Sequence, residues 1–246
     1  MSFSEPCALA VDFGGTSIKM GVTAGERILA TADRIPTAMF ESPQAIIDAM
    51  IASARTLRGQ FPSACVMGMG MPGWCDYQRG VLYQLTNVRV WDREIPVKEM
   101  MEQALGLPVV LDNDANCMAY AEWKMGAGRG MSSLVCLTMG TGIGGGIVVH
   151  DRMLRGRRLS AAGIIKTVDE CTPRHLDEAA RSGCPIALQL WEDTAEMLGC
   201  LIMNLMYTLV PDAFIIGGGV AKAGDLLMKP LLENLRKQLF PLLMED

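Results

Sequence analysis

The sequence predicts an α/β protein in which helices cover mixed β-sheets. Short apolar runs typical of strands alternate with segments of helical periodicity along its 246 residues. Three strands, a helix, a strand, a helix and a strand follow one another, and the pattern restarts near residue 133. Each half opens with two strands joined by a glycine turn, which indicates a duplicated architecture, although identity between the halves is too weak to prove a repeat.

The first half alternates expected strands and helices. Apolar runs bounded by glycine, proline or polar residues mark strands at residues 7–13, 17–23, 28–34, 64–71 and 109–112. Helical periodicity marks helices at residues 42–57, 97–105 and 115–125. Ser42 is placed as the N-cap of the first helix, with Pro43 at its first helical position.

The second half follows the same scheme. Strands are expected at residues 133–139, 143–149 and 213–216, and helices at residues 192–209 and 226–239. The polar segment 151–183 has little periodicity and is expected to be an irregular excursion at a domain cleft. A boundary near residues 127–130 divides the chain into expected domains 1–126 and 127–246.

Composition and charge narrow the functional classes. The chain carries 22 Lys+Arg against 27 Asp+Glu, and its densest basic run, residues 152–158, is typical of an exposed loop. No nucleic-acid partner is expected, because phosphate-backbone binders need clustered positive charge. The eight cysteines form no CxxC pair and the N-terminus has no basic signal region, so a cytoplasmic location is expected. Glycines interrupt the long uncharged window 131–149, so no membrane partner is expected.

Two glycine-rich turns are candidate phosphate-binding loops: Asp12-x-Gly14-Gly15-Thr16-x-x-Lys19 and Thr138-x-Gly140-Thr141-Gly142. Glycine beside a strand end lets backbone N–H groups approach an anion, and two such hairpins facing each other would clamp a polyphosphate. Asp12 suits a magnesium ion held through water, while Thr16 and Lys19 add a hydroxyl and a positive charge. Neither loop has a Walker A or dinucleotide fingerprint, and each alone is more typical of a hairpin without a ligand. A third loop, Gly217-Gly218-Gly219, is weak evidence by itself.

Polar residues also follow the strand that ends near residue 112, where ligands gather in α/β sheets. Asp112-Asn113-Asp114 allows three roles there: helix capping, turn formation and catalysis. Asp112 or Asn113 is well placed to cap the helix beginning near Ala115. A carboxylate near a bound phosphate can instead accept a proton from an attacking hydroxyl.

Nineteen methionines and one very apolar helix invite other interpretations. The alternating stripe Met67-x-Met69-x-Met71 is more typical of core packing than of metal binding. The helix 192–209 is apolar nearly all round, so it is expected at an interdomain hinge or a subunit contact.

The ordered motifs resemble the ROK family of sugar kinases and repressors over residues 8–230. The matching segments are Asp12 to Lys19, Gly70-Met-Pro-Gly73, Thr86-Asn87 with Trp91, Leu107 to Asn116, Gly140 to Gly146 and Ile216 to Val220. The resemblance implies a two-domain fold of the actin, hexokinase and Hsp70 type. It also implies ATP and magnesium as cofactors, a hexose or amino sugar as substrate, and a homodimer as a possible assembly.

The resemblance assigns roles residue by residue. Asp114 is the implied general base on the sugar hydroxyl, and Gly73, Asn87 and Asn113 are implied sugar-binding residues. The two hairpin loops are implied to cradle the phosphates, and residues 217–219 to lie near the adenosine. Family repressors carry an N-terminal helix-turn-helix, for which no room precedes Asp12, so a DNA-binding repressor is not expected.

The chain departs from the family on the sugar and adenine sides. Ile164 and Thr167 stand where the family has a sugar-binding Glu and His, and Asp177 or Glu178, of which we take Glu178, is expected to supply the remaining contact. Structural zinc is not expected, because Cys171, His175 and Cys184 lack the family's spacing. The end at residue 246 predicts a shortened nucleotide domain.

These departures leave two functional hypotheses open. The first is a working ATP-dependent sugar kinase, because the phosphate-transfer residues are present. The alternative is a catalytically impaired regulatory protein that binds sugar or nucleotide. An actin-like assembly protein is disfavoured, because such proteins need no Asn113-Asp114 pair beside a sugar. The sequence does not identify the sugar, since the positions that would specify it are replaced.

Overall fold

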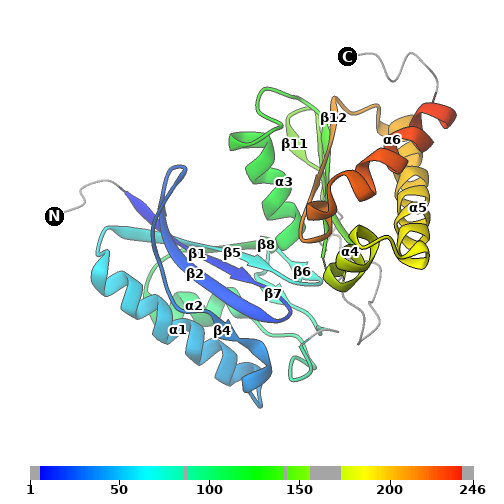
Figure 1. Ribbon diagram of the computed structural model, residues 1–246. Helices are drawn as coiled ribbons and strands as arrows, with labels where there is room; N and C mark the ends of the chain where they lie inside the picture. The colour runs from blue at the N-terminus through cyan, green and yellow to red at the C-terminus, as the bar shows by residue number, and fades with distance from the viewer. Residues whose placement is uncertain (1–5, 86–87, 141–142, 156–172, 240–246) are drawn as a thin grey trace. The chain divides into compact units, whose positions relative to one another are not determined.

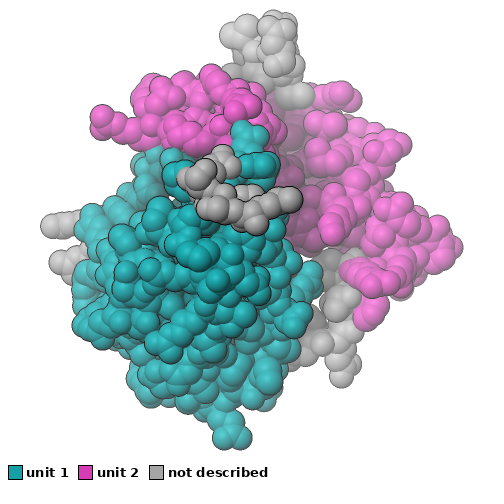
Figure 2. Space-filling model, turned by 90° about the vertical axis from the view of Figure 1, so that its left-hand side faces the viewer, with its two compact units in different colours: residues 1–121, 153–163 teal, residues 122–152, 164–246 magenta. Residues whose placement is uncertain are grey.

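The computed structural model describes residues 6–85, 88–140, 143–155 and 173–239 (Figure 1). The chain divides by contact into two compact units, coloured separately in Figure 2. Unit 1 comprises Met1–Ala121 and Met153–Gly163, and unit 2 comprises Glu122–Arg152 and Ile164–Asp246. Unit 1 therefore includes a second, short segment that begins at Met153 and interrupts unit 2 in the sequence. The predicted domains instead divide the chain once, after residue 126.

Unit 1 is built on a mixed sheet with the strand order β3-β2-β1-β5-β8. Its strands are β1 (Cys7–Phe13), β2 (Ser17–Ala24), β3 (Arg27–Thr31), β5 (Ala64–Met71) and β8 (Val109–Asn113). The short strand β4 (Ile35–Pro36) pairs with β2, and β6 (Cys75–Asp76) pairs with β7 (Val81–Leu82) in a separate ribbon. β1 is antiparallel to β2 and parallel to β5, so the first glycine turn and the ends of β5 and β8 lie at one edge.

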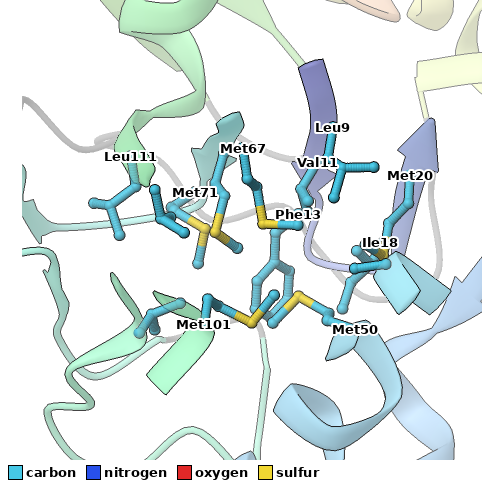
Figure 3. Packing of buried hydrophobic residues seen from close by; sticks show 14 of the residues in the cluster. Leu9, Val11, Phe13, Ile18, Met20, Met50, Met67, Met71, Met101 and Leu111 are labelled. Atoms are coloured by element: carbon cyan, nitrogen blue, oxygen red, sulfur yellow. The ribbon is translucent and has the colours of Figure 1, made fainter. Parts of the chain in front are cut away.

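Helices α1 (Pro43–Gln60) and α2 (Val97–Leu105) cover one face of this sheet (Figure 1). The predicted cap of α1 is confirmed: the Ser42 hydroxyl accepts a hydrogen bond from the Ala45 N–H at 3.2 Å, and Pro43 occupies the first turn. Figure 3 shows Met50, Met67, Met71 and Met101 packed around Phe13. The methionine stripe is therefore core packing, as predicted.

Unit 2 has a smaller sheet with the strand order β11-β10-β9-β12. Its strands are β9 (Leu134–Met139), β10 (Ile143–Val149), β11 (Arg152–Met153) and β12 (Ala213–Gly217). β9 is antiparallel to β10 and parallel to β12, which repeats the arrangement of β1 with β2 and β5. The predicted duplication is thus present as topology, in spite of the weak sequence identity. Helix α3 (Asp114–Met125) begins in unit 1 and ends in unit 2.

The structure corrects two predictions about helices in unit 2. Residues 173–181, predicted to be irregular, form α4 (Pro173–Arg181). Its buried face is only Leu176, Ala179 and Ala180, and ion pairs four residues apart stabilise the polar remainder, so the apolar signal is short. Helix α5 (Pro185–Leu209) starts seven residues before the predicted position at Glu192.

Helix α5 packs against α6 (Asp225–Gln238) and α4. Its buried face includes Trp191, Leu198 and Ile202, which join Leu227 and Leu231 of α6 in the core of unit 2. The sequence predicted α5 at a hinge or a subunit contact and did not predict its packing against α6 within unit 2. A helix that is apolar on two faces does not reveal which face a neighbouring helix covers.

Candidate active site

The carboxyl ends of β1, β5 and β8 bring the predicted residues of unit 1 together. Asp12 is aligned with Gly70 across β1 and β5, and Met71 is aligned with Asn113 across β5 and β8. Because these strands are parallel, the side chains that follow them meet at one edge of the sheet. Asp114 then opens helix α3 directly after β8.

The first glycine turn uses part of its own backbone to hold its shape. The Gly14 N–H donates to the Ser17 carbonyl at 3.0 Å, and the Thr37 hydroxyl donates to the Gly15 carbonyl at 2.7 Å. Within the described residues, the N–H groups of Gly15 and Thr16 donate no hydrogen bond. These two groups are therefore the N–H donors that the turn can offer to an anion.

Asp12 and Lys19 lie opposite each other on β1 and β2, at the base of this turn. The Lys19 ammonium donates to Asp12 Oδ2 at 2.6 Å, and both side chains are about half exposed. An exposed pair of this kind is weak, so either group remains available to a charged ligand.

Asp112 and Asn113 use their side chains to form the turn into α3. Of the two predicted caps, Asn113 makes the cap bond, and Asp112 stabilises the turn. Asp112 Oδ1 accepts from the Asn113 N–H at 2.8 Å and from Asn116 Nδ2 at 3.0 Å. Asn113 Oδ1 accepts from the Ala115 N–H at 3.0 Å, which is an N-cap bond.

The other end of the Asn113 amide holds the loop after β5. Asn113 Nδ2 donates to the Gly73 carbonyl at 3.0 Å and lies 3.5 Å from the Met71 carbonyl, and the side chain is almost completely buried. Gly73 has φ +69°, and an added Cβ would lie 2.8 Å from Leu85, so this position requires glycine. A sugar that binds Asn113 has to share or replace one of these bonds.

Asp114 differs from its two neighbours because the residue is exposed. Its Oδ1 accepts from the adjacent Ala115 N–H at 2.9 Å. Surrounding protein desolvates the carboxyl group and this raises its pKa, with a smaller upward contribution from the charge of Asp12; the Ala115 N–H acts in the opposite direction. A carboxylate with a raised pKa is suited to accept a proton.

The glycine residues predicted in unit 2 also meet at one sheet edge. Gly217 is aligned with Thr138 across β12 and β9, and Gly140 follows β9 directly. Gly218 has φ +91°, and an added Cβ would lie 2.4 Å from the Met139 carbonyl oxygen. The third glycine loop is thus pressed against the second, which only glycine allows at residue 218.

Glu178 lies on α4 in unit 2. Its carboxylate is exposed and accepts from Arg174 Nε at 2.9 Å. The alternative residue, Asp177, is less exposed and pairs with Arg181 through Oδ2, while its buried Oδ1 has no hydrogen-bond partner among the described residues. Of the two, Asp177 has the acceptor atom that still lacks a donor.

Several predicted positions lie outside the described residues. They are Asn87, Thr141, Gly142, Ile164, Thr167 and Cys171. Among the described parts of the chain, no three His, Cys, Asp or Glu side chains form a cluster that would hold a metal ion.

Arg155 is a site residue that sequence reasoning missed. It belongs to the basic run that was interpreted as an exposed loop, yet its guanidinium binds Asp112 Oδ2 through Nε at 3.0 Å and Nη2 at 2.7 Å. The sequence holds no signal for this pair, because the two residues are 43 positions apart and neither belongs to a periodic pattern.

The donor groups of the predicted residues suit Mg-ATP. Asp12 offers one half-exposed carboxylate, and magnesium is commonly held by one or two carboxylates together with water and substrate phosphates. The Gly15 and Thr16 N–H groups and the glycine loops of unit 2 suit phosphate oxygens.

Comparison with known proteins identifies the class. The ROK family model matches two segments of the chain, residues 8–164 and 159–245, which overlap at 159–164. The glucokinase of Streptomyces coelicolor is 30% identical over 94% of this chain and 87% of its own length. The glucokinase of Halalkalibacterium halodurans is 32% identical over 97% and 88%, respectively.

Solved structures agree with this assignment. A ROK family glucokinase from Streptomyces griseus, crystallised with glucose and AMPPNP, is 29% identical, has a TM-score of 0.77 and covers 95% of this chain and 90% of its own. The fold is therefore the mixed α/β fold of these kinases, as predicted. The protein belongs to the ROK family. In the described part of the chain, each helix is too short or too polar to cross a membrane.

Proposed function

We propose that the protein is an enzyme that transfers the γ-phosphoryl group of ATP to a hydroxyl of a hexose or hexose derivative. One observation carries the proposal: Asp114 presents a carboxylate with a raised pKa at a strand-end edge where the neighbouring Asp112 and Asn113 are occupied by the turn. The glucokinase relatives support a hexose as the substrate class.

In the proposed reaction Asp114 is the general base. Its carboxylate accepts the proton of the sugar hydroxyl while the hydroxyl oxygen forms a bond to the γ-phosphorus and the bond to the leaving oxygen of ADP breaks. The raised pKa makes the ionised form a better proton acceptor than an ordinary aspartate. Magnesium, when bound, neutralises charge on the phosphate oxygens.

The nucleotide is assigned to both glycine-loop regions. Gly15 and Thr16 donate backbone N–H groups to phosphate oxygens, Gly14 maintains the turn, Lys19 adds a positive charge, and Asp12 holds magnesium through water. In unit 2 the phosphate loop contains Thr138, Gly140, Thr141 and Gly142, and the adenosine lies near Gly217, Gly218 and Gly219.

The sugar is assigned to Gly73, Asn87, Asn113 and Glu178. Asn113 and Gly73 support each other through the bond from Nδ2 to the Gly73 carbonyl, which fixes the loop that a sugar would contact. Replacement of the family's Glu and His at Ile164 and Thr167 removes two polar contacts, so the substrate specificity is expected to differ from that of glucokinases.

A second candidate function is a regulatory protein that binds sugar or nucleotide with little turnover. The residues Ile164 and Thr167, which stand where the family has a sugar-binding Glu and His, favour it. Binding without sugar-dependent ADP release would identify this alternative.

A coupled assay of ADP release across a panel of hexoses and amino sugars tests the proposal. We expect at least one sugar to stimulate ADP release by the wild-type protein, and the Asp114→Asn variant to give the background rate. A panel in which no sugar exceeds that background contradicts the kinase proposal. Calorimetry with the same sugars and an ATP analogue then decides for or against the regulatory alternative.

We also propose a homodimer that forms through α5. Ile186, Leu190, Met197 and Leu201 are exposed in the described structure and lie on one face at helical spacing. In an antiparallel pair of α5 helices, Ile186 opposes Leu201 and Leu190 opposes Met197, so the stripe is complementary to itself. Sedimentation velocity should show a dimer that Met197→Glu converts to a monomer; a wild-type monomer at high concentration contradicts it.

A cytoplasmic location remains part of the proposal. The cysteines of the described residues form no disulfide with one another, which suits a reducing compartment.

A further inference from the structure

Arg155 forms an ion pair with Asp112, two residues before the proposed base Asp114. Arg155 Nε and Nη2 lie 3.0 and 2.7 Å from the same oxygen, Oδ2 of Asp112. The Arg155 guanidinium also lies over the Tyr77 ring, with Cζ 4.9 Å from its centroid. Although Arg155 is exposed, the salt bridge and the ring contact restrict the orientation of its guanidinium.

The second oxygen of Asp112 accepts hydrogen bonds within the turn between β8 and α3. Oδ1 accepts from the backbone N–H of Asn113 and from the Asn116 side chain, so the carboxylate joins the end of β8 to the first turn of α3. Asp112 is nearly buried, its side chain being 12% exposed. A buried carboxylate needs a partner for its charge, and among the described residues Arg155 supplies that partner.

Arg155 also contributes charge near the first turns of α3. Asp12 faces Asp114 from β1, where Lys19 pairs with Asp12, and Asp112 lies two positions before Asp114. Cys117, one turn along α3, is influenced by the same set. Burial, then the charges of Asp112 and Asp114, raise the pKa of its thiol to about 12, while the charge of Arg155 lowers it. Among the described residues, Arg155 is thus the positive charge that opposes the effect of Asp112 on the pKa of Cys117.

We propose that Arg155 is a positioning residue for phosphoryl transfer. Its ion pair with Asp112 stabilises the turn that places Asn113 against the Gly73 loop and Asp114 near the sugar hydroxyl. The inference rests on the proposed role of Asp114 as base. Arg155 touches no reacting atom in this scheme. It acts through Asp112, so the two side chains should behave as one unit.

Kinetics of paired variants test that coupling. Arg155→Met removes the cation that binds Asp112 Oδ2, and we expect kcat/KM to fall about 10- to 100-fold, the loss typical of a misplaced catalytic group. Asp112→Asn keeps an oxygen acceptor for Asn113 and Asn116, so adding it to Arg155→Met should recover part of the loss. Arg155→Lys should lie between wild type and Arg155→Met.

Arg79→Met is the matched control, because it removes an exposed cation of unit 1 that lies 4.0 Å from Asp76. It should leave kcat/KM at the wild-type value. Wild-type kinetics in Arg155→Met, or losses that simply multiply in the double variant, would overturn the inference.

A carboxyl-carbon NMR titration of the aspartates needs no substrate and separates this inference from the proposed function. The signal of Asp114 is assigned by its loss in Asp114→Asn. Burial raises the pKa of Asp114 most, so a displaced turn in Arg155→Met should shift this pKa, and the double variant Arg155→Met, Asp112→Asn should return it toward the wild-type value. An unchanged pKa in a folded Arg155→Met variant, or an equal shift in Arg79→Met, rejects the positioning role. A wild-type protein that titrates as expected but shows no sugar-dependent turnover rejects only the kinase proposal.

Discussion

The two units end their central strands in the same topology but with different chemistry. β2-β1-β5 in unit 1 and β10-β9-β12 in unit 2 each combine an antiparallel glycine hairpin with a parallel strand. At the edge of unit 1, side chains dominate: Asp12, Lys19, Asn113 and Asp114. The edge of unit 2 is formed mainly by the backbone of glycine residues. Gly218 fits against Met139 only because it has no side chain.

This difference indicates that the two units, although alike in topology, have different roles. Charged side chains can move protons and hold cations, whereas glycine loops offer backbone N–H groups at close range and no titratable group. We therefore expect substitutions in unit 1 to affect the chemical step and substitutions in unit 2 to affect nucleotide binding and local stability.

The largest expected effect is on the chemical step. Asp114→Asn removes the proton acceptor and should lower kcat by about 10²- to 10⁴-fold, the usual contribution of a general base. Nucleotide affinity, measured by calorimetry with an ATP analogue, should stay within a small factor of wild type. Asp225→Asn, which alters an exposed carboxylate on α6, serves as the control and should keep the wild-type kcat. A parallel loss of nucleotide affinity in Asp114→Asn would contradict the different roles of the two units.

The next effect concerns the backbone of unit 2. Gly218→Ala places a Cβ 2.4 Å from the Met139 carbonyl oxygen at φ +91°, so we expect a loss of about 1–3 kcal/mol in the free energy of unfolding. Nucleotide affinity should fall with it. Gly219→Ala meets no atom within 4 Å and should change the free energy of unfolding much less. Equal stability of the two variants in urea unfolding would show that the close approach of the loops is not needed.

A smaller effect is the pH dependence of the chemical step. Only ionised Asp114 can accept a proton, so kcat should fall as the pH drops through its raised pKa, and the midpoint should lie above the ordinary aspartate value of about 3.9. Asp12→Asn removes a neighbouring negative charge, which should lower the pKa of Asp114 and move the midpoint to lower pH. A pH profile of kcat at saturating Mg-ATP checks both statements. A midpoint that stays fixed in Asp12→Asn contradicts the electrostatic link.

The smallest effect concerns the start of β9. The Ser133 and Ser132 N–H groups and the Ser132 hydroxyl donate to Asp212 Oδ2 and lower the pKa of Asp212. A lowered folded-state pKa stabilises the protein above the unfolded-state pKa, and this contribution disappears as the pH falls through the folded-state value. Asp212→Asn should therefore lower the melting temperature by about 2–4 °C at pH 7 and by less near pH 3. A difference that does not depend on pH would mean that charge is not involved.

Local patterns predicted much of this fold. The hairpin of β1 and β2, helix α1 with its Ser42 cap, and the order of strands follow from apolar runs and turn residues, which are local signals. Helix α4 was missed because its apolar face is too short to outweigh its polar residues.

The candidate site was predictable only in part. Strand-end reasoning brought Asp12, Asn113 and Asp114 to one edge, because the ends of parallel strands coincide. The occupation of the Asn113 amide and the Arg155 contact with Asp112 depend on residues about 40 positions away, and no local pattern encodes them. The sequence also left open whether Asp112 or Asn113 caps α3, and the hydrogen bonds assign the cap to Asn113.

Phosphorus NMR of the protein with ATP, magnesium and a stimulating sugar tests the central claim most directly. The γ-phosphate signal of ATP should be replaced by that of a sugar phosphate monoester, at a rate at least about 100-fold lower in Asp114→Asn. Conversion of ATP to inorganic phosphate alone, or the same rate of monoester formation in the variant, would contradict the assignment of Asp114 as the base of a sugar kinase.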